Sequence, residues 1–311
     1  MLAENIVIGQ GTKYPLKGIL TLPDDISTPV PAVVLVHGSG SSNMDEKVGR
    51  VTPFKDIAEG LAKYGVASVR YDKRSFTHGL KMVRDKSLTI TAKEETIEDA
   101  ILATQLLKTD SRIDTDKIFI IGHSMGGMLA PRIDAEGGDY RGLILMAGTP
   151  RRMEEALKDQ LGETLDRMNP LIRKLASGSV NKMLKKFDGM YDVPDEEAKK
   201  IKIGNGATLY YFKDMGQPTV AEYLADNHKP MLIMQGDKDF QVKADVDFAM
   251  YKEILKGRGN VTFRLYENLN HAFVNSVYGL ISKAKQEYNV EQHIGENVIA
   301  DIADWIKDVT E

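Results

Sequence analysis

The chain contains no cysteine. This absence excludes disulfide bonds, catalysis by a thiolate and zinc sites built on cysteine. Long hydrophobic runs are also missing, and none approaches the roughly 18 apolar residues of a membrane-spanning helix. Residues 1–11 show no basic flank followed by an apolar core, so they lack the pattern of a secretory signal. We therefore expect no membrane association and a cytoplasmic location.

A surplus of positive charge is absent as well. The 41 lysine and arginine residues face 45 aspartate and glutamate residues, for a net charge of −4. This balance offers no electrostatic basis for holding phosphate backbones, so we expect no nucleic-acid partner. No two of the six histidines show the i, i+4 spacing of a helical zinc site, so we expect no metal.

The 311 residues suit one large α/β domain with an insertion, or two small domains. Short apolar runs, several of them continuous, predict strands buried on both faces. The predicted strands cover 6–8, 16–22, 32–36, 66–71, 117–121, 142–147, 230–235 and 261–266, and predicted helices cover 54–64, 91–107, 244–255 and 298–309. Because strands and helices alternate along most of the chain, we predict a mainly parallel sheet with helices on both faces.

Residues 149–227 interrupt this alternation. The segment is charged and favours helix, and it has no buried-strand run. Ordinary crossover helices are one interpretation, but the segment is much longer than the usual connection within an α/β unit. We interpret it as a helical cap inserted between residues 1–148 and 228–311, which together form the core.

The most informative motif is Gly122-His123-Ser124-Met125-Gly126, at the end of the predicted strand 117–121 and before a helix-compatible segment. A serine presented on such a sharp turn can act as a nucleophile, and the tight turn needs glycine on both sides. An ordinary strand-to-helix turn is the alternative. Nucleophilic catalysis further requires a base, an acid that orients it and donors for an oxyanion.

His271 is the candidate base, because it lies on a loop after the late strand 261–266 and follows Ser124 in the chain. The candidate acid is Asp239, beyond the strand 230–235, and Asp237 is the less favoured alternative because its place beside Gly236 suits a turn. Asp245 and Asp247 are expected to be solvated. The order Ser124, Asp239, His271 differs from that of the two common serine protease types.

Two backbone N–H groups are needed to bind the negative charge that develops during acyl transfer. The residue after the nucleophile, Met125, is expected to supply one of them. For the other we assign Ser39, in the glycine-rich loop 38–40 after the strand 32–36. A simple glycine turn is the alternative interpretation of this loop.

Taken together, these segments resemble the α/β-hydrolase superfamily over most of the chain. Finer details are similar to bacterial serine esterases of the dienelactone-hydrolase-like and cinnamoyl (feruloyl) esterase branch. The resemblance rests on the motifs His37-Gly38-Ser39-Gly40, Asp45-Glu46, Arg70-Tyr71-Asp72-Lys73-Arg74, Gly122 to Gly126, Asp239-Phe240-Gln241-Val242 and Asn270-His271-Ala272-Phe273.

The resemblance implies an eight-stranded sheet with an antiparallel second strand and a cap after the sixth strand. It also implies hydrolysis of carboxylic esters without a cofactor, and we expect small or medium acyl or aryl esters as substrates. A peptidase, thioesterase or acyltransferase would use the same triad, and a non-catalytic binding module is a further alternative. The sequence leaves the physiological substrate open, and formation of a homo-oligomer as well. Residues 71–74 are expected to form a structural ion-pair cluster beside the site, with a grip on a substrate carboxylate as the alternative.

Overall fold

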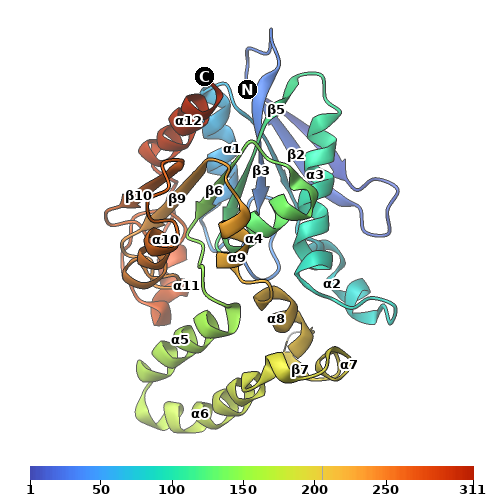
Figure 1. Ribbon diagram of the computed structural model, residues 1–311. Helices are drawn as coiled ribbons and strands as arrows, with labels where there is room; N and C mark the ends of the chain where they lie inside the picture. The colour runs from blue at the N-terminus through green and yellow to red at the C-terminus, as the bar shows by residue number, and fades with distance from the viewer. Residues whose placement is uncertain (205) are drawn as a thin grey trace.

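A computed structural model describes residues 1–204 and 206–311 of the chain. Its centre is an eight-stranded sheet in the order β1-β2-β4-β3-β5-β6-β9-β10 (Figure 1). The strands are β1 (Leu2–Ile8), β2 (Leu16–Leu22), β3 (Val30–Val36), β4 (Ala67–Tyr71), β5 (Ile113–His123), β6 (Gly142–Met146), β9 (Met231–Gly236) and β10 (Val261–Tyr266). The strand β2 runs antiparallel to both of its neighbours, and the pairs from β4 to β10 are parallel. The expected eight-stranded, mainly parallel sheet is therefore confirmed.

Helices cover both faces of this sheet. Those of the core are α1 (Pro53–Lys63), α2 (Arg74–Arg84), α3 (Glu98–Lys108), α4 (Met125–Ile133), α10 (Ala249–Ile254), α11 (Ala284–Tyr288) and α12 (Glu296–Thr310). Short 3-10 or π-helical turns stand beside them at Lys93–Ile97, Asp134–Gly138, Ala244–Phe248 and Ile281–Lys283.

The strand β3 shows why a strand in the middle of this sheet must be an unbroken apolar run. Val33 and Leu35 belong to a core cluster with residues of α1 and α12. Val34 and Val36 belong to a second cluster, with residues of α3 and α4. Because successive side chains of a strand point to opposite faces, a strand covered on both sides must be apolar at every position.

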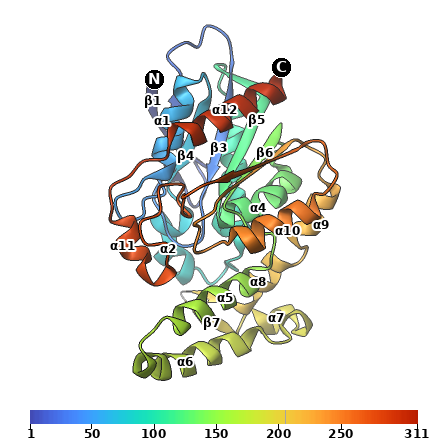
Figure 2. The ribbon, with the colours of Figure 1, turned by 90° about the vertical axis from the view of Figure 1, so that its left-hand side faces the viewer.

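The segment between β6 and β9 is helical and extends from one end of the molecule in both ribbon views (Figures 1 and 2). Its elements are α5 (Met153–Asp166), α6 (Pro170–Leu184), α7 (Asp195–Ala198), β7 (Lys202–Gly204), β8 (Ala207–Thr208), α8 (Leu209–Gly216) and α9 (Val220–Asp226), with 3-10 turns at Lys185–Phe187 and Met190–Asp192.

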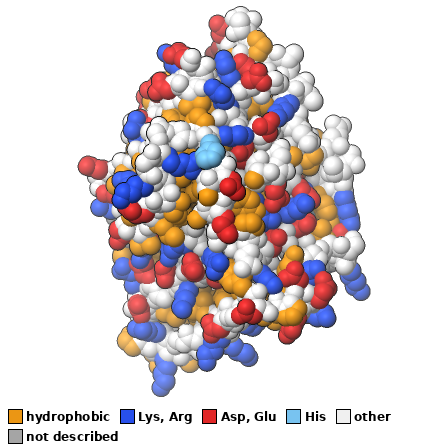
Figure 3. Space-filling model, viewed as in Figure 1, with side chains coloured by type: hydrophobic (Ala, Val, Ile, Leu, Met, Phe, Trp, Pro, Cys, Tyr) orange, Lys and Arg blue, Asp and Glu red, His pale blue; other side chains and the backbone are white. Residues whose placement is uncertain are grey.

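The outer part of this helical segment is well solvated. No residue of α6 is buried. Lysine and arginine side chains gather along the lower margin of the molecule, over α6 (Figure 3). By contrast, Tyr211 and Phe212 of α8 are buried in the same core cluster as α3 and α4. Through α8 and α9 the segment thus shares a hydrophobic cluster with the core.

Candidate active site

Ser124 lies in a strained turn between β5 and α4. Its backbone has φ 54° and ψ −116°, outside the regions that residues other than glycine normally occupy. Strain of this kind is concentrated at functional sites. The strand ends at His123 and the helix begins at Met125, so the serine lies at the C-terminal edge of the sheet and at a helix N-terminus.

Glycine is required on both sides of this turn. A Cβ atom on Gly122 would lie 2.2 Å from the carbonyl oxygen of Gly126. One on Gly126 would lie 2.1 Å from the carbonyl oxygen of Val36. Both contacts are with backbone atoms that cannot rotate away, so the turn itself requires glycine at 122, and the close approach of β3 requires it at 126.

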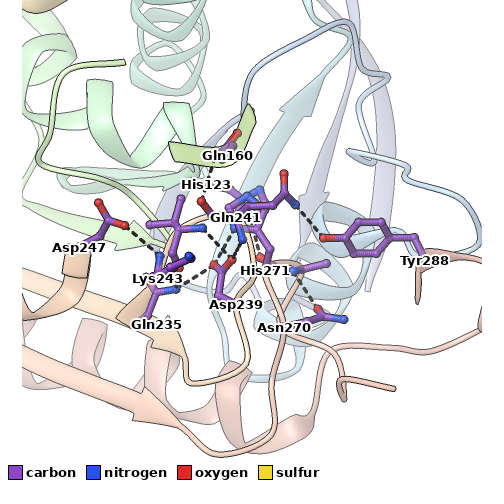
Figure 4. Close-up of polar contacts among 12 residues, drawn as sticks. His123, Gln160, Gln235, Asp239, Gln241, Lys243, Asp247, Asn270, His271 and Tyr288 are labelled. Carbon is purple, nitrogen blue, oxygen red and sulfur yellow. Dashed lines mark hydrogen bonds and ion pairs between the residues drawn. The ribbon is translucent and has the colours of Figure 1, made fainter. Parts of the chain in front are cut away.

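Asp239 and His271 are in direct contact. The imidazole Nδ1 of His271 lies 2.7 Å from Oδ2 of Asp239, whose side chain is fully buried. Three further donors fix the carboxylate: the Gln235 side chain at 2.8 Å and the backbone N–H groups of Gln241 and Val242 at 2.8 and 2.9 Å (Figure 4). A carboxylate that is surrounded by donors in this way can hold one imidazole orientation.

The neighbouring aspartates have other roles. Asp237 accepts a hydrogen bond from the backbone N–H of Asn268 at 2.6 Å, as expected of a turn residue. Asp245 is exposed, as predicted. The prediction that Asp247 is solvated was wrong: the residue is fully buried and accepts hydrogen bonds from Thr149 at 2.6 Å and Arg151 at 2.8 Å. These donors come from the chain just after β6, which a reading of the helix 244–255 alone does not include.

Ser124 and His271 both line a cavity of 210 Å³. Its walls also include Gly38, Ser39, Ser41, Ser42, Glu46, Lys47, Val48, Pro53, His123, Gln241, Ala272 and Tyr288. None of the described residues in 149–227 lines it. Since the loops after β3, β5, β9 and β10 all contribute, the cavity lies where the carboxyl ends of parallel strands meet.

The loop after β3 passes close to the serine. A Cβ atom on Gly38 would lie 3.1 Å from Cβ of Ser124. The Gly38 N–H donates to Oε1 of Glu46 at 2.7 Å, so it is already engaged. The N–H of the next residue, Ser39, has no acceptor among the described residues. On the other side, Met125 is the first residue of α4, and the N–H groups of a first helical turn have no acceptor within the helix.

A buried ion pair supports the same region. Oε2 of Glu46 lies 2.9 Å from Nδ1 of His123. Burial opposes charge on both groups, but their mutual attraction prevails, so the pKa of His123 is raised and that of Glu46 is lowered. His123 also donates from Nε2 to the backbone carbonyl of His271 at 2.8 Å. The pair thereby connects the loops that carry Gly38 and His271.

The expected ion-pair cluster at residues 71–74 is present. Arg74 is buried and donates to Asp99 and Glu98, so carboxylates of the protein itself occupy its guanidinium. Lys73 is also buried and lies 3.2 Å from Glu95. Neither Lys73 nor Arg74 lines the cavity, which favours the structural interpretation over a grip on substrate.

The remaining histidines do not contact Asp239 or His271. His37 is buried and contacts the backbone carbonyl of Asn43 at 2.9 Å. His228 and His293 are exposed, and His78 is half-buried. No cluster of three or more potential metal-ligating side chains occurs among residues 1–204 and 206–311. Over the same residues, no helix has the length and apolar character needed to cross a bilayer.

Sequence reasoning missed three residues that support the site. Gln235 carries a polar side chain inside the apolar strand β9, and a buried polar residue in such a run is a usable signal. Gln241 donates from its side chain to the hydroxyl of Tyr288 at 2.9 Å, and both line the cavity. Tyr288 comes from α11, and nothing in its local sequence marks it.

Comparison with known proteins identifies the family of the chain. The family described as serine aminopeptidase, S33, matches residues 27–276. The chain belongs to this family. Esterase EstD of Thermotoga maritima is 34% identical over 303 residues, which are 94% of this chain and 65% of EstD. The chain therefore spans less than two thirds of the length of this relative.

Solved structures share the fold over nearly the whole chain. Est1E from Butyrivibrio proteoclasticus matches with a TM-score of 0.61 and 16% identity, covering 98% of both chains. The Pyrococcus furiosus esterase Pf2001 matches with a TM-score of 0.60 and 16% identity, covering 100% of this chain and 92% of the other. The predicted α/β-hydrolase fold is therefore confirmed.

Proposed function

We propose that this S33 family member is a serine carboxylic-ester hydrolase with Ser124 as nucleophile, His271 as base and Asp239 as orienting acid. The observation that carries the proposal is the His271–Asp239 contact at 2.7 Å beside a cavity that also holds the strained Ser124. The similarity to esterase EstD supports ester hydrolysis over the other reactions that such a triad serves.

The mechanism is acyl transfer in two steps. Ser124 attacks the ester carbonyl while Nε2 of His271 takes the hydroxyl proton. The resulting oxyanion is bound by the N–H groups of Ser39 and Met125, and it collapses when His271 gives the proton to the leaving alcohol. Water then enters, is deprotonated by His271 and attacks the acyl-enzyme, and return of the proton to Ser124 releases the acid. No metal or cofactor takes part in these steps.

The cavity suggests small substrates. At 210 Å³ it is smaller than the roughly 300 to 1,000 Å³ of drug-sized ligand sites. Several wall residues are polar or charged, among them Ser41, Ser42, Glu46 and Lys47. We therefore expect short acyl groups to be turned over faster than long ones.

We further propose that residues 149–227 act as a cap on the core. The support is their position between β6 and β9 and the packing of α8 against the core beside the site. Because no described residue of this segment lines the cavity, its influence would be exerted through the residues that support the site, such as Gln241. Gln160 of α5 donates to the backbone carbonyl of Gln241 at 2.9 Å.

Hydrolysis of p-nitrophenyl esters, from acetate to decanoate, by the wild type and Ser124→Ala tests the proposal. We expect turnover to be fastest on acetate or butyrate and to be lost in the variant. Turnover retained by a folded Ser124→Ala protein would overturn the assignment.

The family description also names aminopeptidases, so aminoacyl p-nitroanilides belong in the same assay. Cleavage of these amides at rates above those of the esters would favour a peptidase. Failure of a fluorophosphonate probe to label Ser124 in the wild type would favour a non-catalytic role instead.

A further inference from the structure

We propose that Lys73 is a positioning residue for the oxyanion-binding loop, and that Glu95 and Tyr211 link it to the helical insertion. The inference rests on the proposed function, since it concerns how the Ser39 N–H is aimed. It assigns a role to a buried charge that the mechanism above does not use.

The position of Lys73 is unusual for a lysine. Its side chain is 2% exposed, and its Nζ donates to the backbone carbonyl of Gly38 at 2.8 Å. A buried ammonium group is costly unless it is paired and hydrogen-bonded. Glu95, in the π-helical turn Lys93–Ile97, supplies the pairing carboxylate at 3.2 Å. The pairing with Glu95 therefore allows the buried ammonium group of Lys73 to lie against the backbone carbonyl of Gly38.

Because the peptide unit is planar, the contact between Lys73 and the Gly38 carbonyl also sets the direction of the Ser39 N–H. The bond between Gly38 and Ser39 is trans, so the Gly38 C=O and the Ser39 N–H point in opposite directions. When Lys73 holds the carbonyl on one side, the Ser39 N–H must face the other. The contact with Lys73 therefore fixes the direction of the N–H that we assign to the oxyanion.

Gly38 explains why such a restraint is needed. A glycine backbone adopts many conformations at little cost, so the adjoining peptide units can rotate easily. A side chain cannot replace it without strain, since a Cβ atom would lie 3.1 Å from Cβ of Ser124. Two buried charges instead hold the residue at both ends, Glu46 at its N–H and Lys73 at its C=O.

The chain of contacts continues into the insertion. Tyr211 of α8 donates from its hydroxyl to Oε2 of Glu95 at 2.7 Å, while Lys73 approaches Oε1. Burial and the nearby Glu95 raise the pKa of Tyr211 well above its ordinary value, so the hydroxyl stays a donor. The same hydroxyl lies 3.6 Å from Sδ of Met125, which carries the other assigned N–H. One tyrosine of the insertion thus contacts both Glu95, the partner of Lys73, and the side chain of Met125.

A purely structural role would give different results from a positioning role. If Lys73 only neutralises Glu95, then removing both charges should restore both stability and turnover, because replacing both members of a buried pair can be nearly neutral. If Lys73 aims the Ser39 N–H, removing both charges should restore stability and leave turnover low.

The experiment compares Lys73→Met, the double variant Lys73→Met/Glu95→Gln and Tyr211→Phe with the wild type. It measures kcat and KM on p-nitrophenyl butyrate, the thermal midpoint, and inhibition by an alkyl trifluoromethyl ketone, which forms a tetrahedral adduct with the serine. The matched control is Lys256→Met, an exposed lysine whose ion-pair partner is the equally exposed Glu253.

We expect Lys73→Met to lower kcat by about 10- to 100-fold with KM changed less than about threefold. Loss of an entire oxyanion donor costs about 10² to 10³ in rate, and a misaimed donor should cost somewhat less. The affinity for the trifluoromethyl ketone should fall by a similar factor. Tyr211→Phe should lower kcat by about three- to tenfold in the same manner, and the control should match the wild type.

The double variant keeps the test decisive if Lys73→Met alone does not fold. A double variant with wild-type kcat, or with unchanged affinity for the ketone, would overturn the role of Lys73. Wild-type kcat in Tyr211→Phe would overturn the link to the insertion. If Ser124→Ala retains turnover, the proposed function itself fails. If Ser124→Ala is inactive and the Lys73 variants are fully active, only the present inference fails.

Discussion

The hydroxyl of Thr149 donates to the buried carboxylate of Asp247 at 2.6 Å, and this contact ties the start of the insertion to the chain beyond β9. Arg151 reinforces it with a hydrogen bond at 2.8 Å. The Lys243 N–H donates to the same carboxylate at 2.9 Å, near the loop that carries Asp239. The carboxylate of Asp247 thus holds in place both the chain that follows β6 and the end of the loop that carries Asp239.

Replacing Asp247 with alanine should destabilise the protein by about 3 to 5 kcal/mol, because the change removes the acceptor of the Thr149 hydroxyl and of the Lys243 N–H and leaves Arg151 with Asp159 alone. Urea unfolding measures this loss. The matched control is Asp245→Ala, two residues earlier and exposed, which should change stability by less than about 0.5 kcal/mol. Equal stability of the two variants would contradict the structural role of Asp247.

Replacing Asp239 with asparagine should lower kcat by about 10⁴-fold if it acts as the triad acid, because an amide can impose the wrong imidazole tautomer. Steady-state kinetics on p-nitrophenyl butyrate measures the loss. Asp237→Asn is the control, since an asparagine oxygen can still accept from the Asn268 N–H and Asp237 does not contact His271. A larger loss in Asp237→Asn would mean that the acid was assigned to the wrong residue.

Stability should fall as the pH drops from 6.5 toward 4, because burial lowers the pKa of His37 from 6.5 to about 4. In that window the unfolded chain binds a proton that the folded state excludes, so acid favours unfolding. The depressed pKa therefore stabilises the protein above pH 6.5, and this contribution, on the order of 3 kcal/mol, is lost by pH 4.

The variant His37→Gln isolates this effect. Urea unfolding at pH 7 and pH 4.5 should show a smaller loss of stability in the variant than in the wild type. The variant is needed because the raised pKa of His123 acts in the opposite sense, with its stabilisation complete below pH 6.5 and lost as the pH rises through that pKa. Equal losses in the two proteins would mean that His37 is not a buried neutral histidine.

Much of the fold could be predicted because its signals are local. The unbroken apolar run of β3 reflects burial on both faces, and each side chain along it reports its own environment. The turn at Ser124 is equally local, since the clash at Gly122 involves the backbone of Gly126, four residues later. Because the parallel strands β9 and β10 end at the same edge of the sheet, the loops that follow them bring Asp239 and His271 together.

The residues that support the site could not be predicted in this way, because their partners are distant in the chain. Asp247 lies 98 residues from Thr149, and a sequence reading of its helix alone predicted a solvated side chain. Lys73 and the Gly38 carbonyl are 35 residues apart, and Tyr211 reaches Glu95 across 116 residues.

The sequence by itself therefore determined the sheet, the turn that presents Ser124 and the kinds of residue available for acyl transfer. Only the tertiary structure decided which charges are buried and which backbone groups they hold. The physical reason is that burial and ion pairing depend on the sum of all neighbours in space. Propensity and periodicity, in contrast, are expressed within a few residues of one another.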